Sequence, residues 1–379
     1  MSQLRSLASP VPAFEVGGDF SLGAEEELML LDRDGCLTEA GPALTQLTPW
    51  PDPSGRFSPE VFTCEIEYGT SVAATAGELV GHLGRGRGRI IAAGHRPLAL
   101  GLHPLAELGE VRFVHTHRYD AISTELAGLM RTPTAAYQVH VGMPDPAAMV
   151  SAFRALRNRL CLFRALAAGS PFWYGRDSGL ASARAAIMWS YPRVGVPPVF
   201  HSFDEYADAA CQQITAAGVP DYTYLWWDLR PQPRLGTIEI RVMDSVPSLE
   251  LAAGLAALAQ GLARDAVERP SSVDLPEAVL RENDFRAVRY GLEARVTDLD
   301  GCERPIRAIA QDAVAQARLT LGPDGAADPL DCVSAALAGE SECARQRRLA
   351  SRCGLDALLR DLSRRTASSL ERMPEALLA

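Results

Sequence analysis

The residues of this chain best suited to chemistry are three consecutive glutamates in an apolar stretch, residues 23–31 (GAEEELMLL). Side chains on a β-strand alternate between the two faces of the sheet, so Glu25 and Glu27 share one face and Glu26 points to the other. Neighbouring carboxylates repel each other, and burying them is costly without a positive charge between them. A divalent cation supplies that charge, and an all-oxygen site favours Mg²⁺, Mn²⁺ or Ca²⁺ over Zn²⁺. An exposed acidic edge strand is the alternative explanation.

Three further strand-like segments, residues 61–68, 137–141 and 236–242, repeat the pattern of one apolar and one polar face. The polar faces carry Thr63, Glu65 and Glu67; Gln138 and His140; and Thr237, Glu239 and Arg241. Such strands are typical of an antiparallel sheet that helices cover on one side. A solvated outer face explains any one of them. Four strands that together carry acids, a histidine and an arginine favour a cavity for metal ions and phosphate.

Composition excludes several other classes of function. The chain has 379 residues, 47% of them hydrophobic, and a net charge of −10, which argues against a nucleic-acid partner. Residues 1–14 do not resemble a signal peptide and no apolar run reaches the length of a membrane span, so we expect no membrane partner. The eight cysteines are scattered without a CxxC pair, which favours a cytoplasmic location and neither disulfides nor a zinc ribbon.

Every one of the 37 basic residues is arginine. The absence of lysine excludes a Walker A lysine, the strand lysine of protein kinases and a Schiff base with pyridoxal phosphate. Any phosphate must therefore be held by arginine, backbone N–H groups or metal ions. GC-rich coding is the ordinary cause of such a composition, and the chemical exclusion holds regardless.

The pattern along the chain predicts strands and helices that alternate and then give way to helices. Strands are expected near residues 20–32, 60–69, 95–101, 136–142, 223–229 and 236–243. Helices are expected near 75–93, 117–131, 146–168, 203–217, 248–268, 275–296, 303–320 and 341–371. One-sided strands fit an antiparallel or mixed sheet better than a doubly wound parallel one. The glycine run 84–88 is expected to be a flexible part of a helix rather than a phosphate loop.

The segment 169–200 is the longest without clear periodicity. Long loops in compact domains are usually functional or disordered, and the aromatic residues here argue against disorder. Arg176 and Arg184 lie in it and are suited to binding carboxylate or phosphate. A packed surface loop with solvated arginines is the alternative.

Several motifs together resemble a known family, the carboxylate–amine ligases of the glutamate–cysteine ligase type 2 family. That family belongs to the fold group of glutamine synthetase and the guanidino kinases. The matching segments lie between about residues 20 and 295: 23–27 (GAEEE), 65–67 (EIE), 139–142 (VHVG), 170–180 (SPFWYGRDSGL), 226–231 (WWDLRP), 235–244 (LGTIEIRVMD), and Glu282 and Asn283 with Arg286, Arg289, Tyr290 and Gly291.

The resemblance implies an α+β fold: a curved antiparallel sheet that forms an open funnel, covered by helices on its outer face, with a helical C-terminal third. Residues 1–379 then form one catalytic domain whose helical C-terminal portion begins at about 297. ATP and two or three Mg²⁺ ions are expected at the mouth of the funnel. The implied metal ligands are Glu25, Glu27, Glu67 and Glu239, with Glu60 as a further candidate. His140, Arg176, Asn283 and Arg286 are expected at the nucleotide, and Arg241 and Arg184 at the transferred phosphate.

The implied reaction forms an amide between two small-molecule substrates, a carboxylate and an amine, through an acyl phosphate. The γ-carboxylate of glutamate is the expected donor, and a homodimer is the default assembly. Two departures from the family pattern, Leu28 in place of an aromatic residue and Asp284-Phe285 in place of Lys-Trp, point to an altered substrate or nucleotide contact. A guanidino-kinase-like phosphotransferase and a non-catalytic nucleotide-binding relative are the alternatives.

Overall fold

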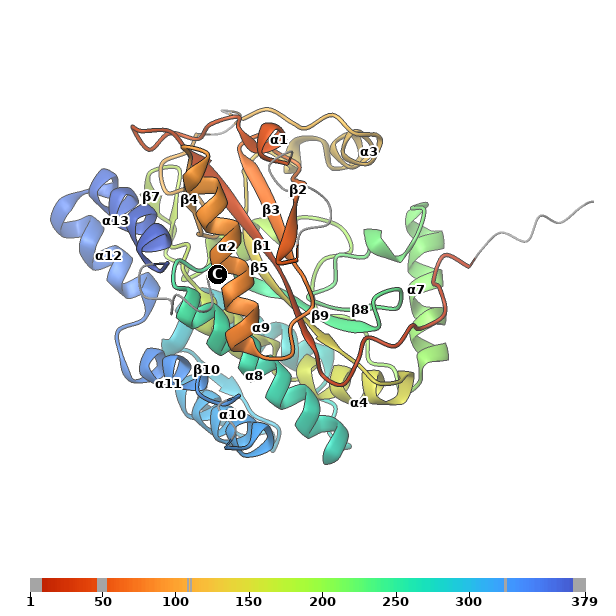
Figure 1. Ribbon diagram of the computed structural model, residues 1–379. Helices are drawn as coiled ribbons and strands as arrows, with labels where there is room; N and C mark the ends of the chain where they lie inside the picture. Colours follow the sequence, from red (N-terminus) through yellow and green to blue (C-terminus); the bar gives the residue numbers. More distant parts are fainter. Residues whose placement is uncertain (1–8, 46–52, 108, 110, 324–325, 371–379) are drawn as a thin grey trace, which may run out of the picture.

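A seven-stranded antiparallel sheet runs through the centre of the protein in a computed structural model that describes residues 9–45, 53–107, 109, 111–323 and 326–370 (Figure 1). The strand order is β2-β3-β1-β5-β9-β8, and β4 pairs with the end of β1. The strands are β1 (Leu22–Leu31), β2 (Gly55–Pro59), β3 (Glu65–Thr70), β4 (Arg96–Leu98), β5 (Ala136–Gly142), β8 (Leu229–Gln232) and β9 (Thr237–Asp244). The predicted antiparallel, open α+β architecture is confirmed.

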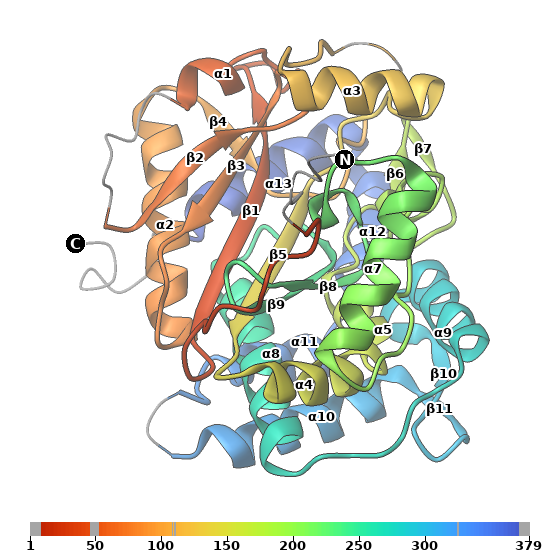
Figure 2. The same cartoon turned by 90° about the vertical axis from the view of Figure 1, so that its right-hand side faces the viewer.

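Helices cover one face of this sheet, as Figures 1 and 2 show. Among the helices that contact the sheet are α2 (Ala76–Ala92), α4 (Pro146–Arg157), α5 (Leu160–Ala167) and α8 (Leu249–Glu268). A second layer packs against α8 and α5 and consists of α9 (Glu277–Tyr290), α10 (Ile306–Leu321) and α11 (Leu330–Ala338). The apolar faces of the central strands meet these helices in one large core. Their polar faces are therefore left on the opposite side of the sheet.

One acidic side chain of β1 does face the helices. Glu26 is completely buried and pairs with the equally buried Arg87 of α2, whose Nη2 lies 2.6 Å from Glu26 Oε1. Arg87 also donates to the carbonyls of Val246 and Pro247 before α8, and to the carbonyl of Thr366 and the hydroxyl of Ser369 near the C-terminus. A single guanidinium thus joins the sheet to three helical segments.

The glycine run 84–88 lies inside α2, which is continuous from Ala76 to Ala92. A Cβ on Gly86 would lie 2.6 Å from the ring of Tyr68 on β3, closer than real atoms approach. The run is therefore a site of close helix–sheet packing, and the prediction that it lies in a helix and not in a phosphate loop is confirmed.

Several element boundaries differ from the prediction. The helices predicted at 146–168 and 341–371 are each two helices: α4 and α5 meet at Asn158 and Arg159, and α12 (Glu342–Cys353) and α13 (Leu355–Ser368) meet at Gly354, whose φ is +82°. The strand predicted at 223–229 is a 3₁₀ turn, η2 (Tyr222–Tyr224), and a loop that precedes β8. In each case side-chain pattern alone did not reveal the break in the backbone.

Short elements were missed where the pattern was weak. The C-terminal third is not entirely helical, because β10 (Arg295–Thr297) and β11 (Glu303–Pro305) form a hairpin. The segment 169–200 is also not structureless: it holds the hairpin of β6 (Phe172–Trp173) and β7 (Arg176–Asp177) and the helix α6 (Ala183–Met188). No disulfide joins the eight cysteines, all of which the structure describes. Within the described part of the chain no helix has both the length and the apolar character needed to cross a membrane.

Candidate active site

The polar faces of β1, β3, β5 and β9 meet at a cavity of about 280 Å³, which we call the inner cavity. Strand pairing sets the neighbours: Glu27 lies opposite Glu67, and His140 opposite Glu239. The charged residues that line it are Glu25, Glu27, Glu60, Glu65, Glu67, Arg118, Arg184, Arg230 and Arg241. The predicted gathering of carboxylates from separate strands is therefore present.

Two groups of side chains within this region have the geometry of a metal site. Glu27, Glu60 and Glu67 form one group, and Glu25, His140 and Glu239 form the other. In each group the ligand atoms lie within 4.8 Å of one another. We call them the three-glutamate group and the histidine group. Carboxylate oxygens are the ligands that Mg²⁺ and Mn²⁺ prefer, so the first group suits a hard cation.

Crowding of like charges dominates the three-glutamate group. Burial and then the charges of Glu27 and Glu25 raise the pKa of Glu60 to about 8, against an ordinary value of 4.5. Burial, followed by the charges of Glu25, Glu60 and Glu27, raises the pKa of Glu67 well above its usual value. These raised pKa values favour the protonated form of both carboxyl groups, and a cation bound here would favour the ionised form. A divalent cation bound here would offset the repulsion among these carboxylates.

Glu27 is oriented by β5. Its Oε2 accepts a hydrogen bond of 2.7 Å from the Ala136 backbone N–H, and its Oε1 accepts one of 2.6 Å from Gln138 Nε2. The other amide atom of Gln138, Oε1, is buried and has no hydrogen-bond partner among the described residues. Gln138 Oε1 is thus a buried acceptor without a partner beside clustered carboxylates, and it is suited to contact a cation or a hydrogen-bond donor of a ligand.

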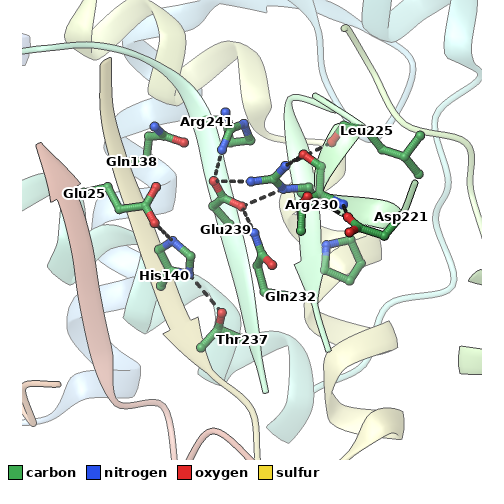
Figure 3. Close-up of polar contacts among 12 residues, drawn as sticks. Glu25, Gln138, His140, Asp221, Leu225, Arg230, Gln232, Thr237, Glu239 and Arg241 are labelled. Atoms are coloured by element: carbon green, nitrogen blue, oxygen red, sulfur yellow. Dashed lines mark hydrogen bonds and ion pairs between the residues drawn. The ribbon is translucent and has the colours of Figure 1, made fainter. Parts of the chain in front are cut away.

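The histidine group is held by contacts that Figure 3 shows. His140 Nδ1 lies 3.0 Å from the Thr237 hydroxyl, and its Nε2 lies 3.5 Å from Glu25 Oε1. Burial lowers the pKa of His140, but the contact with Glu25 and its negative charge outweigh burial, so the net pKa is raised. With Nδ1 turned to Thr237, Nε2 is the ring nitrogen that a metal ion would use.

Glu239 is surrounded by donors (Figure 3). Arg230 Nε and Gln232 Nε2 donate to its Oε2 at 2.8 and 2.7 Å, and Arg230 Nη2 and Arg241 Nη1 contact its Oε1. Burial raises its pKa, yet the charges of Arg230 and Arg241 hold that pKa below the usual range. A cation at this carboxylate must therefore share it with these arginines or displace one of them.

Arg184 is the other cation predicted to act on phosphate, and α6 places it in the inner cavity. Its Nη1 lies 3.9 Å from Asp244 Oδ1, and its buried Nε has no hydrogen-bond partner among the described residues. Burial lowers the pKa of this guanidinium, against the charges of Asp244 and Glu27, which raise it. A buried arginine with an unused donor is suited to an anionic ligand.

The structure does not bring three of the predicted nucleotide-binding residues to this site, since none of them lines the inner cavity or the cavity next to it that Glu25 and His140 line. Arg176 is exposed on β7. The Asn283 amide is used to hold β10, with hydrogen bonds of 2.8 Å to and from the backbone of Thr297. Arg286 lies on the surface and pairs with Glu282 and Glu303. In the structure, the side chains of Asn283 and Arg286 therefore hold neighbouring elements together.

Some residues that line the cavity were not predicted to be site residues. Glu65 and Gln138 were on the predicted polar faces, so alternation alone was signal enough to include them. Burial, followed by the charges of Glu60 and Glu27, raises the pKa of Glu65 well above its usual value. The apolar lining from α3 (His117–Leu126) had no such signal, because that helix lies outside the sheet.

The comparisons with known proteins agree with this architecture. The crystal structure of glutamate–cysteine ligase from Francisella tularensis in complex with AMP matches with a TM-score of 0.68, over 96% of this chain and 92% of that one, at 11% sequence identity. This likeness is one of fold. A Haloferax volcanii glutamate–cysteine ligase is 32% identical over 355 residues, covering 90% of this chain and 96% of its own. A Ruegeria pomeroyi protein provisionally named glutamate–cysteine ligase 2 is 37% identical over 305 residues, 78% of this chain and 79% of its own.

Fold, site and relatives together define an ATP-dependent ligase that forms C–N bonds. The model of glutamate–cysteine ligase family 2 matches residues 21–352, and the chain belongs to that family.

Proposed function

We propose that this enzyme joins the γ-carboxylate of glutamate to an amine through an acyl phosphate, with ATP as phosphoryl donor and Mg²⁺ ions held by the two acidic groups. The observation that carries the proposal is that the three-glutamate group lines one cavity together with Arg184, Arg241 and Glu25, the residue that links it to the histidine group. Phosphoryl transfer is catalysed mainly by positioning and by neutralising charge, and these residues are suited to both. Bound in these groups, Mg²⁺ would neutralise phosphate charge.

A second cavity of about 490 Å³, the outer cavity, adjoins the first and supports a place for the nucleotide. Glu25 lines both cavities, and His140 and Thr237 line the outer one. Its remaining lining includes Gly69, where a Cβ would meet nothing within 4 Å, so the lack of a side chain leaves room for a ligand close to the backbone. We therefore place ATP in the outer cavity and the two substrates in the inner one.

The reaction is written in two steps. An oxygen of the carboxylate attacks the γ-phosphorus, the bond to the bridging oxygen breaks, and ADP leaves. The amine nitrogen then attacks the acyl carbon, a C–N bond forms and the C–O bond to phosphate breaks. One amine proton ends on the departing inorganic phosphate. Arg184 and Arg241 would stabilise the negative charge that develops between the reacting groups.

Arg241 has a particular place in this scheme. It contacts Glu239, whose two oxygens also accept hydrogen bonds from Arg230 and Gln232. If Glu239 also held a cation in the histidine group, Arg241 would give up part of its contact with this carboxylate, and its guanidinium would be free to contact the phosphate. The contact with Glu239 thus keeps Arg241 within reach while no ligand is bound.

The test is product analysis with the purified chain, ATP, Mg²⁺, glutamate and a panel of amines. We expect one ADP and one inorganic phosphate for each amide formed, and no turnover without Mg²⁺. A stable phosphorylated product without amide would instead identify a phosphotransferase. The absence of ADP release with any amine would overturn the proposal.

A further inference from the structure

The inner cavity contains a carboxylate that belongs to neither acidic group. Glu65 is 3% exposed and begins β3, two residues before Glu67. Its Oε1 is buried and has no hydrogen-bond partner among the described residues. A buried acceptor without a partner costs free energy, so a donor supplied by a ligand would be stabilised strongly there.

The wall beside the acidic groups is apolar and aromatic. The apolar residues that line this part of the inner cavity are Phe62, Ile122, Leu126, Met130, Met188 and Trp226. Tyr119 of α3 also lines it, and its hydroxyl is already donated to the Pro59 carbonyl at 2.7 Å, so it presents mainly ring surface. A ligand group placed against this wall gains by burying apolar surface and not by forming hydrogen bonds.

Arg118 of α3 also lines this cavity, and its guanidinium already has partners within the protein. Arg118 Nη1 and Nη2 donate to the hydroxyl and carbonyl of Thr223 at 3.0 and 3.1 Å, and the guanidinium stacks on the Tyr224 ring at 4.1 Å. A substrate carboxylate at this wall would therefore have to break these contacts to pair with Arg118, and the unused donor of Arg184 is given to the phosphate in the proposed function. Apolar lining together with an engaged arginine disfavours an amino acid as the acceptor.

On the basis of the proposed function, we propose that Glu65 binds the N–H group of the acceptor amine. We further propose that this acceptor is a primary amine with an apolar or aromatic substituent and no carboxylate. Glu65 orients the nitrogen by accepting a hydrogen bond from it, and the apolar wall described above, which includes Ile122 and Leu126 of α3, binds the substituent. Glu65 is in this account a specificity-determining residue, and it takes no proton in the reaction.

The test begins with the wild-type enzyme and three amines: 2-phenylethylamine, ethanolamine and cysteine, each with ATP, Mg²⁺ and glutamate. We expect kcat/KM to be at least about tenfold higher for 2-phenylethylamine than for either of the others. No turnover with any amine would contradict the proposed function itself. Turnover with cysteine preferred over 2-phenylethylamine would overturn this inference alone.

The variant Glu65→Gln then isolates the residue. Glutamine has a single acceptor oxygen, and the Thr134 backbone N–H already engages the carboxyl group of Glu65, so the amide N–H group of glutamine would replace the acceptor that the amine needs. KM for 2-phenylethylamine is therefore expected to rise about 10- to 100-fold, while KM for ATP and the affinity for Mn²⁺ change less than twofold. Glu268→Gln, an exposed change on α8, serves as the control and should match the wild type. An unchanged KM for the amine, or a loss of Mn²⁺ affinity in its place, would overturn the role given to Glu65.

A second variant keeps the inference testable if Glu65→Gln does not fold. Ile122→Ala shortens the apolar wall without touching a carboxylate. It is expected to reduce the preference for 2-phenylethylamine over ethanolamine about tenfold. An unchanged preference would show that the substituent does not bind at this wall.

Discussion

Replacing Glu27 by glutamine is expected to lower kcat/KM at least about 100-fold and to weaken Mn²⁺ binding to a similar degree. Glu27 lies in the three-glutamate group and is fixed by hydrogen bonds from Ala136 and Gln138. Glutamine fills the same volume but removes a negative charge and presents an N–H group where an oxygen is needed. The measurements are the initial rate of ADP release and an electron paramagnetic resonance titration with Mn²⁺.

The same substitution should leave the fold intact. Burial is the largest cause that raises the pKa of Glu27, and this outweighs the lowering by Arg184 and Arg241. An ionised side chain with a raised pKa costs stability as the pH climbs through that pKa, and glutamine removes this cost. The unfolding midpoint of Glu27→Gln without metal should therefore equal or exceed that of the wild type. Wild-type Mn²⁺ affinity in this variant would contradict the assignment of Glu27 as a ligand.

Replacing Arg87 by methionine is expected to lower the free energy of unfolding by about 3–5 kcal/mol. The change leaves the Glu26 carboxylate buried without its partner. It also deprives the carbonyls of Val246, Pro247 and Thr366 of a donor. Each of these buried groups would remain out of contact with water and without a hydrogen bond, which destabilises the folded state. Urea denaturation followed by circular dichroism measures the effect.

Two controls define what the Arg87 result means. Arg264→Met removes an exposed pair with Glu268 on α8 and should change stability by less than about 1 kcal/mol. The double variant Glu26→Gln/Arg87→Met should recover part of the loss, because it no longer buries an unpaired charge. A loss below about 1 kcal/mol in Arg87→Met would show that water or other groups compensate Glu26.

The core of the site was predictable from sequence because strand alternation is strict. Once residues 23–31 are a strand, Glu25 and Glu27 must share a face, and the same rule places Glu67, His140 and Glu239. The alternation of side chains predicts which residues share a face, but it does not predict the order of the strands in the sheet. Antiparallel pairing of β3-β1-β5-β9 brings those faces together.

What the sequence did not reveal depends on contacts between distant segments. Nothing near Glu26 indicates that Arg87, 61 positions away, completes its pair. Likewise Asn283 is engaged with Thr297 across the start of a hairpin whose strands are three residues each. A motif match placed Asn283 at the nucleotide, although the contact that uses its amide is structural. Gly354 ends a helix through a positive φ that glycine permits but does not require.

The most direct test of the account is a crystal grown with Mn²⁺ and a non-hydrolysable ATP analogue, with data collected at the manganese edge. The account predicts anomalous peaks about 2.1 Å from carboxylate oxygens of the three-glutamate group and beside Glu25 and His140, with the nucleotide in the outer cavity. An ordered analogue with no manganese at either group would contradict the account.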